Sequence, residues 1–243
     1  MVHRKALPTH PLVALPLPIE TWATAAVHRP KKPIVLLTGF DAFGGEAINP
    51  SWQACTAWHG RQIAGHRMVA ARLPTVFDES LLVLRELMRV HKPVLTVCVG
   101  QAGGRNAMSL ERIAINVNDA RIADNAGESP LDTPVVAGAP AAYFTSLPIK
   151  AMLLALVEGG VAAEVSQTAG TFVCNHVFYG LMHALATQRG FKRARGGFIH
   201  VPFLPEQGTP SMTLADMTRG LQIAVRTALA TSHDAHVSAG AVQ

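Results

Sequence analysis

Residues 33–51, which read PIVLLTGFDAFGGEAINPS, contain the change from strand to helix that decides the fold. Residues 34–37 are a fully apolar run that ends at Thr38-Gly39, a pattern typical of a buried parallel strand. A glycine-containing loop follows, and Asn49 then offers a suitable N-cap before Pro50 at the first helical position. The stretch therefore predicts a strand whose carboxyl end opens into a loop and then a helix.

The same alternation of strand and helix continues along the chain. Apolar or alternating runs predict further strands at residues 68–73, 94–99, 113–117, 163–167 and 197–201. Helical spacing of apolar residues predicts helices at residues 77–88, 149–156, 176–188 and 214–228. Strands that alternate with helices predict an α/β domain whose central, mostly parallel sheet is covered on both faces.

Composition excludes several classes of protein. The 243 residues are 49% hydrophobic and 15% charged, which excludes disorder as the main state. No apolar run approaches the roughly 18 residues of a membrane span. Residues 1–32 hold five of the 21 basic side chains and one of the 16 acidic ones, so most of the net charge of +5 lies there. Aromatic residues are only 6% of the chain and no basic patch contains them, so we expect no nucleic-acid partner. Because no apolar run is long enough to span a membrane, we expect no membrane partner either.

The chain divides into three parts. Residues 1–32 contain five prolines and no sustained periodicity, which predicts a basic, proline-broken arm before the domain. Residues 33–230 carry the alternating pattern without an internal linker and predict a single domain. Residues 231–243 are small and polar, so we expect a flexible tail.

The cysteines and histidines indicate neither a disulfide framework nor a metal site. Cys55, Cys98 and Cys174 are too few and too scattered for either, and their odd number suits a reducing compartment. His176 and His183 lie seven residues apart, which is not the spacing of a ligand pair. No glycine-rich nucleotide-binding motif follows any strand. We therefore expect a cytoplasmic protein without a zinc site or a bound nucleotide.

Cys174 is the candidate nucleophile. It lies where an extended segment turns into the helix expected from residue 176. A thiol at a helix N-terminus can have its pKa lowered from about 8.5 toward neutrality, which favours the reactive thiolate. The alternative is an inert, buried thiol, the usual state of a free cysteine.

A cysteine nucleophile needs a base and a group that orients the base. His200 follows the apolar strand at residues 197–199 directly, so it can project from the carboxyl end of that strand. Three carboxylates in the polar stretch after Gly104 are candidates for the orienting group, and their spacing does not choose among Glu111, Asp119 and Asp124.

The first loop carries two phenylalanines, Phe40 and Phe43, three residues apart. Aromatic side chains on such a loop either cover the core or form a flat apolar slot for a small ring, with Gln101 nearby as a polar partner.

Taken together, these segments resemble the pyroglutamyl-peptidase I family, also called pyrrolidone-carboxylate peptidases. The matching segments are residues 39–51 (GFDAFGGEAINPS), 99–124 (VGQAGGRNAMSLERIAINVNDARIAD), 140–152 (PAAYFTSLPIKAM), 169–179 (AGTFVCNHVFY) and 197–207 (GFIHVPFLPEQ). They occur in consistent order from about residue 33 to about residue 230. The arm at residues 1–32 has no counterpart in the family core, and Asp41-Ala42 is a small departure inside the first loop.

The resemblance implies a cytosolic cysteine peptidase that removes an N-terminal pyroglutamyl residue from peptides. It implies a three-layer α/β/α domain that assembles as a homo-oligomer, a tetramer or a dimer, without a metal or organic cofactor. By the same similarity Cys174 is the nucleophile, His200 the base and Glu111 the orienting acid.

The resemblance also implies a pocket for the lactam ring. Its expected residues are Phe40, Phe43 and Phe172 around the ring, Val173 and Ile122 beside it, Gln101 at its boundary and Arg121 near the oxyanion. Two alternatives stay open from the sequence: a cysteine amidase that acts on another small cyclic or N-acyl amide, and a lactam-binding protein that has lost turnover.

Overall fold

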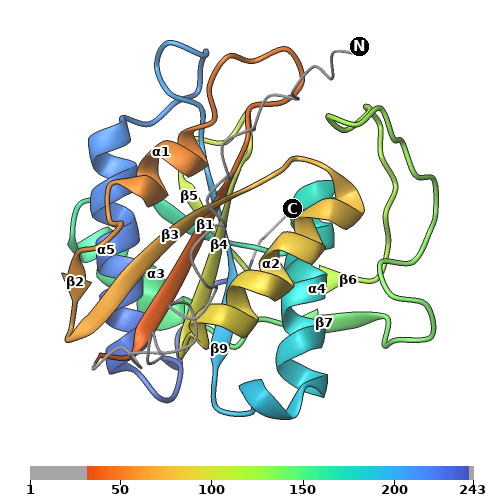
Figure 1. Ribbon diagram of the computed structural model, residues 1–243. Helices are drawn as coiled ribbons and strands as arrows, with labels where there is room; N and C mark the ends of the chain where they lie inside the picture. The colour runs from red at the N-terminus through yellow and green to blue at the C-terminus, as the bar shows by residue number, and fades with distance from the viewer. Residues whose placement is uncertain (1–31, 241–243) are drawn as a thin grey trace, which may run out of the picture. The chain divides into compact units, whose positions relative to one another are not determined.

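The computed structural model describes residues 32–240, which belong to one compact unit beginning at Lys32 (Figure 1). The predicted arm, apart from its last residue, and the last three residues of the predicted tail lie outside the described part. The division of the chain at residues 32 and 230 therefore stays a prediction.

The centre of the unit is a seven-stranded sheet with the order β2-β3-β1-β4-β9-β5-β8. Its strands are β1 (Ile34–Phe40), β2 (Gln62–Ile63), β3 (His66–Leu73), β4 (Leu95–Gln101), β5 (Met108–Glu111), β8 (Ala163–Ser166) and β9 (Arg195–Val201). Strand β1 is parallel to β3 and β4, β4 to β9, and β5 to β8. Only the β2–β3 and β5–β9 pairs of this sheet are antiparallel, which confirms the prediction of a mostly parallel sheet.

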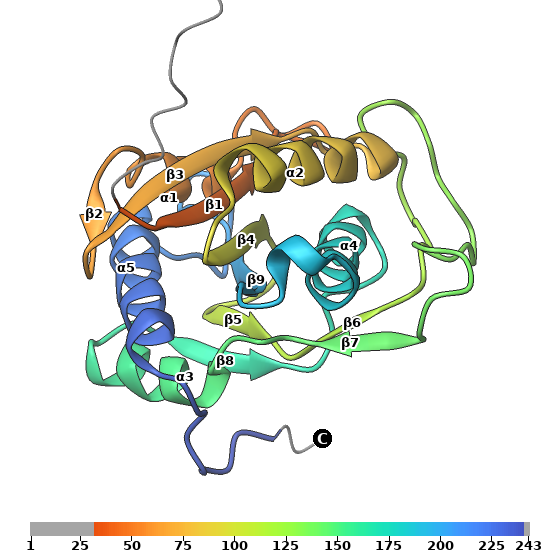
Figure 2. The same ribbon diagram turned by 60° about the horizontal axis from the view of Figure 1, so that its bottom comes forward.

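Within residues 32–240, five α-helices cover the two faces of the sheet (Figure 2). Helices α1 (Pro50–Thr56), α3 (Ile149–Glu158) and α5 (Leu214–Ala230) lie on one face. Helices α2 (Phe77–His91) and α4 (Val173–Thr187) lie on the other, and the short 3-10 helix η1 (Arg189–Phe191) follows α4. A separate two-stranded ribbon, β6 (Ile113–Ile115) and β7 (Ala142–Phe144), lies beside α4. The predicted three-layer α/β/α arrangement is confirmed.

The core has two parts because successive side chains of a strand point to opposite faces of the sheet. In β1, Val35 and Leu37 pack toward α1, α3 and α5, whereas Ile34 and Leu36 pack toward α2 and α4. Every residue of β1 and β4 is buried, as expected for strands covered on both faces.

The helix start predicted at Asn49 is confirmed, since its side chain accepts a hydrogen bond from the Ser51 backbone N–H at 3.1 Å. Several boundaries differ from the prediction by a few residues, and those near the candidate site matter most. Helix α4 begins at Val173, which places Cys174 inside its first turn. Strand β5 lies in a stretch for which the sequence predicted no strand, and the predicted strand at residues 113–117 ends at Ile115. None of the helices described is long and apolar enough to cross a membrane.

Candidate active site

The strand order brings the predicted catalytic residues together. Strands β1, β4 and β9 are parallel neighbours, so their carboxyl ends meet at one edge of the sheet (Figure 1). His200 is near the carboxyl end of β9, and β5, which carries Glu111, pairs with β9 on its other side. The connection from β8 to α4 leads to Cys174. Ligands commonly bind at this edge of an open α/β sheet.

His200 and Glu111 form a buried hydrogen-bonded pair. The imidazole Nδ1 lies 2.7 Å from the carboxylate Oε1, and both residues are almost completely enclosed. A carboxylate at Nδ1 fixes the proton on that nitrogen and leaves Nε2 as the basic nitrogen of the ring. Of the three acids that the sequence left open, the geometry therefore pairs Glu111 with the histidine.

The other two acids have different surroundings. Asp119 is exposed. Asp124 is buried, and its carboxylate accepts backbone hydrogen bonds from Phe77, Ala126 and Glu128. It therefore caps the start of α2 and holds the following turn.

The Cys174 sulfur lies over Gly100, the residue of β4 that pairs with His200 and has no side chain. A Cβ atom placed on Gly100 would lie 2.7 Å from the Cys174 Sγ. Gly100 is the register partner of His200 in the neighbouring strand, and side chains of register partners project from the same face of a sheet. Because residue 100 is a glycine, the thiol has space on the face of the sheet from which the His200 side chain projects.

The expectation of a lowered thiol pKa is wrong. Burial raises the pKa of Cys174 to about 12, and the nearby Glu111 carboxylate raises it further, while Arg105 acts in the opposite direction. Cys174 is half-buried, and the packing around its sulfur removes hydration that stabilises a thiolate, which is the largest effect on its pKa. The thiol is therefore protonated until a base removes its proton.

The Glu111 carboxylate is ionised in spite of its burial. Burial alone would raise its pKa, but the hydrogen bond and charge of His200, with smaller contributions from Ser166 and Arg105, hold the pKa below its ordinary value. Glu111 Oε1 also accepts a hydrogen bond from Arg105 Nη1 at 2.7 Å.

The residues predicted for the lactam pocket fall into two groups. Phe43 and Phe172 are half-buried, and their ring centroids lie 6.0 Å apart in a tilted arrangement. Phe40 and Val173 are buried in the core between the sheet and helices α2 and α4. Gln101 ends β4 and is almost buried, and its Oε1 accepts a hydrogen bond from Gln207 at 3.1 Å.

Arg121 and Ile122 are exposed on a segment that is anchored at both ends. At one end the Asp119 N–H donates to the Thr171 carbonyl at 3.0 Å, just before α4. At the other end the Asn125 side chain donates to the Ala42 carbonyl, at 2.9 Å, in the loop after β1. The segment thus spans from the helix of the candidate nucleophile to the loop that carries Phe43.

Sequence reasoning missed the polar residues that hold the start of α4. Asn175 exchanges hydrogen bonds with the backbone of Ile115 and donates to the Val117 carbonyl, and His176 Nδ1 lies 2.9 Å from Asn118 Oδ1. Burial lowers the pKa of His176 to about 4, so this ring is neutral. The available signal was an Asn-His pair in an otherwise apolar helix, because buried polar side chains require partners.

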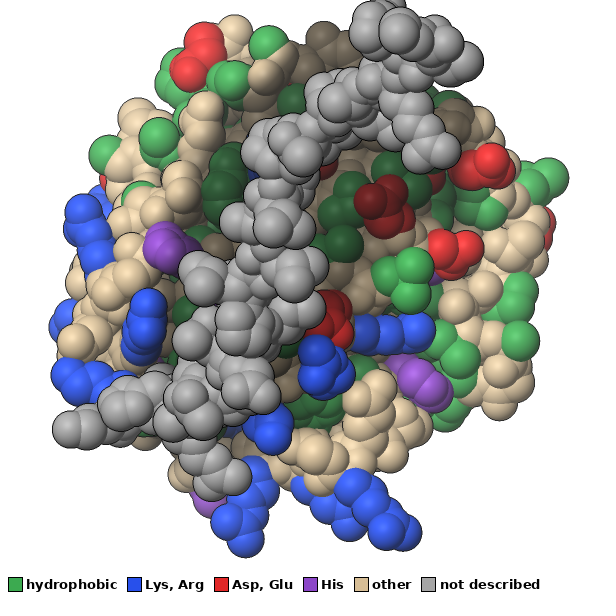
Figure 3. All heavy atoms as spheres, in the orientation of Figure 1, with side chains coloured by type: hydrophobic (Ala, Val, Ile, Leu, Met, Phe, Trp, Pro, Cys, Tyr) green, Lys and Arg blue, Asp and Glu red, His purple; other side chains and the backbone are tan. Residues whose placement is uncertain are grey.

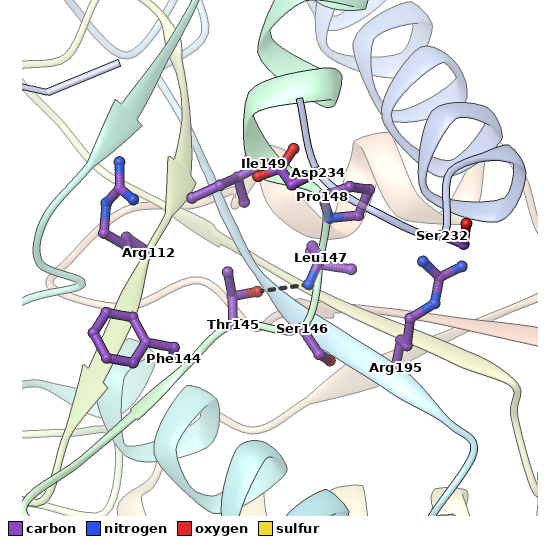
Figure 4. A pocket seen from close by; sticks show the side chains of 10 residues that line it. All are labelled: Arg112, Phe144, Thr145, Ser146, Leu147, Pro148, Ile149, Arg195, Ser232 and Asp234. Atoms are coloured by element: carbon purple, nitrogen blue, oxygen red, sulfur yellow. Dashed lines mark hydrogen bonds between the residues drawn. The ribbon is translucent and has the colours of Figure 1, made fainter. Parts of the chain in front are cut away.

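Two further features of the molecule are a surface distribution of charge (Figure 3) and a second cavity. Figure 3 shows basic side chains along the lower and left margins of the face in view, and acidic ones mainly in its upper half. A cavity of about 250 Å³ is lined by Arg112, Arg195 and Asp234 among others (Figure 4). Asp234 accepts backbone hydrogen bonds at the start of α3, and Arg195 donates to a carbonyl just after α5, so these charges serve the fold. The described residues contain no cluster of His, Cys, Asp and Glu that could hold a metal ion.

Comparison with known proteins gives consistent matches. The family model of pyroglutamyl peptidase matches residues 33–231. The chain is 55% identical over 213 residues to pyrrolidone-carboxylate peptidase 1 of Ralstonia nicotianae, covering 86% of this chain and 98% of that protein. A pyrrolidone-carboxylate peptidase of Bacillus thuringiensis is 52% identical over 196 residues, which is 79% of this chain and 90% of that protein.

Solved structures match as well. The crystal structure of pyroglutamyl peptidase I from Bacillus amyloliquefaciens superimposes with a TM-score of 0.83 at 47% identity, covering 85% of this chain and 100% of that one. A mutant pyrrolidone carboxyl peptidase from Pyrococcus furiosus gives a TM-score of 0.78 at 40% identity, with coverages of 81% and 98%.

Proposed function

Because the chain belongs to the pyroglutamyl peptidase family, it is a cysteine peptidase that removes N-terminal pyroglutamate, and we propose that Cys174, His200 and Glu111 carry out this reaction. The observation that supports the triad most directly is the buried 2.7 Å pair of His200 and Glu111 beside the space over Gly100 that holds the thiol. In this proposal Cys174 is the nucleophile, His200 the base and Glu111 the orienting acid.

The proposed reaction begins with a neutral thiol. Since its pKa is raised to about 12, Cys174 has to lose its proton to His200 as the sulfur attacks the carbonyl carbon of the pyroglutamyl–peptide bond. Glu111 holds the ring and stabilises the imidazolium that forms. The imidazolium then protonates the leaving amine, and a thioester to the pyroglutamyl group remains. Water activated by His200 hydrolyses this thioester and releases pyroglutamate.

The start of α4 supplies hydrogen-bond donors for the oxyanion. The residue before this helix, Phe172, makes no side-chain cap, and Cys174 is the second helical residue. The first backbone N–H groups of a helix have no partners inside the helix. Such donors, aimed at an oxyanion, contribute about 3 kcal/mol each to the stability of the transition state.

The proposed lactam pocket is apolar and lies beside the thiol. Phe43 and Phe172 give it a pair of half-buried aromatic faces, with Phe40 and Val173 as the core behind them. Arg121, Ile122 and Gln101 are proposed for its rim and boundary. A lactam ring is neutral and compact, so apolar walls with a few hydrogen-bonding groups suit it better than a charged anchor.

We further propose that the protein works in the cytoplasm as a homo-oligomer, a tetramer or a dimer. The cysteines of the described part are free, which fits a reducing compartment. Phe144 and Val157 are 68% and 60% exposed, and association of subunits can bury such side chains. Light scattering of the purified protein measures the mass, and a monomer at micromolar concentration would contradict the oligomer.

The proposed function is tested by hydrolysis of pyroglutamyl-aminomethylcoumarin by the reduced protein. We expect release of the fluorophore from this substrate, none from the prolyl analogue that lacks the ring carbonyl, and none from Cys174→Ala. Circular dichroism of the variant controls for folding. Turnover by folded Cys174→Ala would place the nucleophile elsewhere, and inactivity of the reduced wild type would contradict the peptidase assignment.

A further inference from the structure

Arg105 contacts the proposed triad but has no part in the reaction described above. It lies in the loop between β4 and β5, and its Nη1 donates to Glu111 Oε1 at 2.7 Å. Its Nη2 donates to the Thr168 carbonyl at 3.3 Å. We propose that Arg105 is a positioning residue, which holds Glu111 against His200 and balances the carboxylate charge beside the Cys174 thiol. The inference rests on the proposed triad and adds a fourth residue to it.

The two carboxylate oxygens of Glu111 are used unequally. Oε1 accepts from both His200 and Arg105, whereas Oε2 is buried without a hydrogen-bond partner. Two donors that converge on one oxygen fix which oxygen faces the imidazole. Without Arg105, the buried carboxylate would keep its hydrogen bond to His200 and the smaller contribution of Ser166, and a buried charge with so few partners is costly. We infer that the carboxylate would then rotate or take up a proton.

Arg105 also connects Glu111 to the loop of the nucleophile. The Thr168 carbonyl that accepts from Arg105 also accepts from the Ser166 hydroxyl at 3.0 Å, and the Thr168 hydroxyl accepts from the Gly170 N–H at 3.0 Å. Thr168 is therefore hydrogen-bonded to residues on both sides of it, between the end of β8 and the start of α4. Because one guanidinium contacts both Glu111 and Thr168, it connects the acid to the part of the chain that leads to Cys174.

The charges around the thiol also favour this role for Arg105. The groups that act on the thiol are Glu111 from β5, Cys98 from β4 and Arg105 from the loop between these strands, with His200 as the proposed base on β9. Once His200 holds the thiol proton, the site contains two anions, the thiolate and Glu111, and one imidazolium. Arg105 brings the sum to zero. An opposite charge within a few ångströms favours the ionised form of a group, so Arg105 offsets the repulsion between Glu111 and the thiolate.

The test measures the reactivity of the thiol separately from peptidase activity. The second-order rate constant for alkylation of Cys174 by iodoacetamide is measured at about pH 8 in the wild type, Arg105→Gln and Arg105→Lys, with Cys174→Ala as the blank. Because the pKa of the thiol lies well above this pH, the rate follows the small fraction of thiolate, and loss of a nearby cation should lower it by about tenfold in Arg105→Gln. Arg105→Lys keeps the charge and should recover most of this rate.

Peptidase kinetics give the second readout. Arg105→Gln should lower kcat on the pyroglutamyl substrate by about ten- to a hundredfold, while KM changes much less, since the arginine acts on the triad and not on the lactam. Lysine presents a single point charge and does not reproduce the two-pronged contact with Glu111 and Thr168, so Arg105→Lys should recover only part of kcat.

Arg112 provides a matched control. It follows Glu111 directly, and its Nε donates to Gln167 Oε1 at 2.9 Å, one residue before Thr168. Its side chain lines the separate cavity of Figure 4 and, among the described residues, makes no hydrogen bond to Glu111. Arg112→Gln should therefore leave the alkylation rate and kcat unchanged.

The outcomes separate this proposal from the proposed function. A wild-type alkylation rate and kcat in Arg105→Gln would overturn it, and so would an equal loss of rate in Arg112→Gln. A lower melting temperature with an unchanged alkylation rate would show a structural role and would overturn it as well. If the wild type does not hydrolyse the pyroglutamyl substrate, the peptidase assignment fails, while the alkylation rates still decide the role of Arg105.

Discussion

A single methyl group added at Gly100 should disable the site without preventing folding. A Cβ at this position would lie 2.7 Å from Cys174 Sγ and 2.8 and 2.9 Å from two atoms of the Phe198 ring. These separations are about 1 Å shorter than ordinary van der Waals contact, so the sulfur or the ring has to move by about that distance. Gly100 lies inside β4 and does not have a left-handed backbone conformation, so the effect of Gly100→Ala comes from the collision.

The expected magnitude follows from this displacement. A shift of about 1 Å in a reacting group costs roughly a hundredfold in rate, and overpacking a core costs about 1–3 kcal/mol in the free energy of unfolding. We therefore expect Gly100→Ala to lower kcat/KM for pyroglutamyl-aminomethylcoumarin by about a hundredfold. Its urea unfolding should show the smaller, separate loss of stability.

A double-mutant cycle identifies the collision with the sulfur. Replacing Cys174 by Ala removes Sγ, so Gly100→Ala should destabilise the Cys174→Ala background less than the wild type, by at least about 0.5 kcal/mol. Gly197→Ala is the control, because its Cβ would collide with Thr145 and Leu147 instead. That variant should lose stability without a comparable loss of kcat/KM. Wild-type kcat/KM in Gly100→Ala, or strictly additive effects in the cycle, would refute the assignment of this space to the thiol.

Two further variants test the acids of the site region. Glu111→Gln keeps the size of the side chain but loses the charge that stabilises the imidazolium, so kcat should fall by roughly 10³–10⁴-fold, and an unchanged kcat would exclude the orienting role. Asp124→Asn should lower the free energy of unfolding by about 2–3 kcal/mol at pH 7, because the carboxylate accepts three backbone hydrogen bonds. Those hydrogen bonds hold the pKa of Asp124 below its usual range although burial raises it, so the stabilisation is present at neutral pH. This stabilisation decreases as the pH falls below about 4, the usual pKa of an aspartate, and is lost once the pH passes the lowered pKa of Asp124. Urea unfolding that shows the same difference between wild type and Asp124→Asn at about pH 7 and about pH 2.5 would contradict this reasoning.

The sequence predicts the elements whose formation depends on local pattern. The apolar runs at β1 and β4 are buried on both faces of the sheet, and the N-cap at Asn49 forms as expected. The position of His200 at a strand end was also readable, because a polar side chain directly follows an apolar run. These features depend on residues that are neighbours in the chain.

Features that depend on distant partners were not readable in the same way. Strand β5 is short and receives its register from β9, about ninety residues later, as the pairing of Ser109 with His200 shows. The pairing of Glu111 with His200 depends on this register, and so the spacing of acids alone could not choose among them. The proposed role of Arg105 likewise depends on its contacts with Glu111 and Thr168, which are distant in sequence. Nothing in the loop sequence distinguishes it from an exposed arginine.

The raised pKa of Cys174 explains why the site needs all of its charged groups. A nucleophile at a helix N-terminus in contact with water can rely on the helix dipole to form a thiolate. Packing the half-buried Cys174 between α4 and the sheet removes part of the hydration of the thiolate, and this loss is the largest effect on its pKa. The proton then has to move to His200 during the attack, and the imidazolium that results needs the Glu111 carboxylate. That carboxylate repels the thiolate in turn, which is the repulsion that Arg105 offsets. His200, Glu111 and Arg105 thus each stabilise a charge that forms on, or lies on, another group of the site. Removing any of the three should slow proton transfer more than it weakens substrate binding.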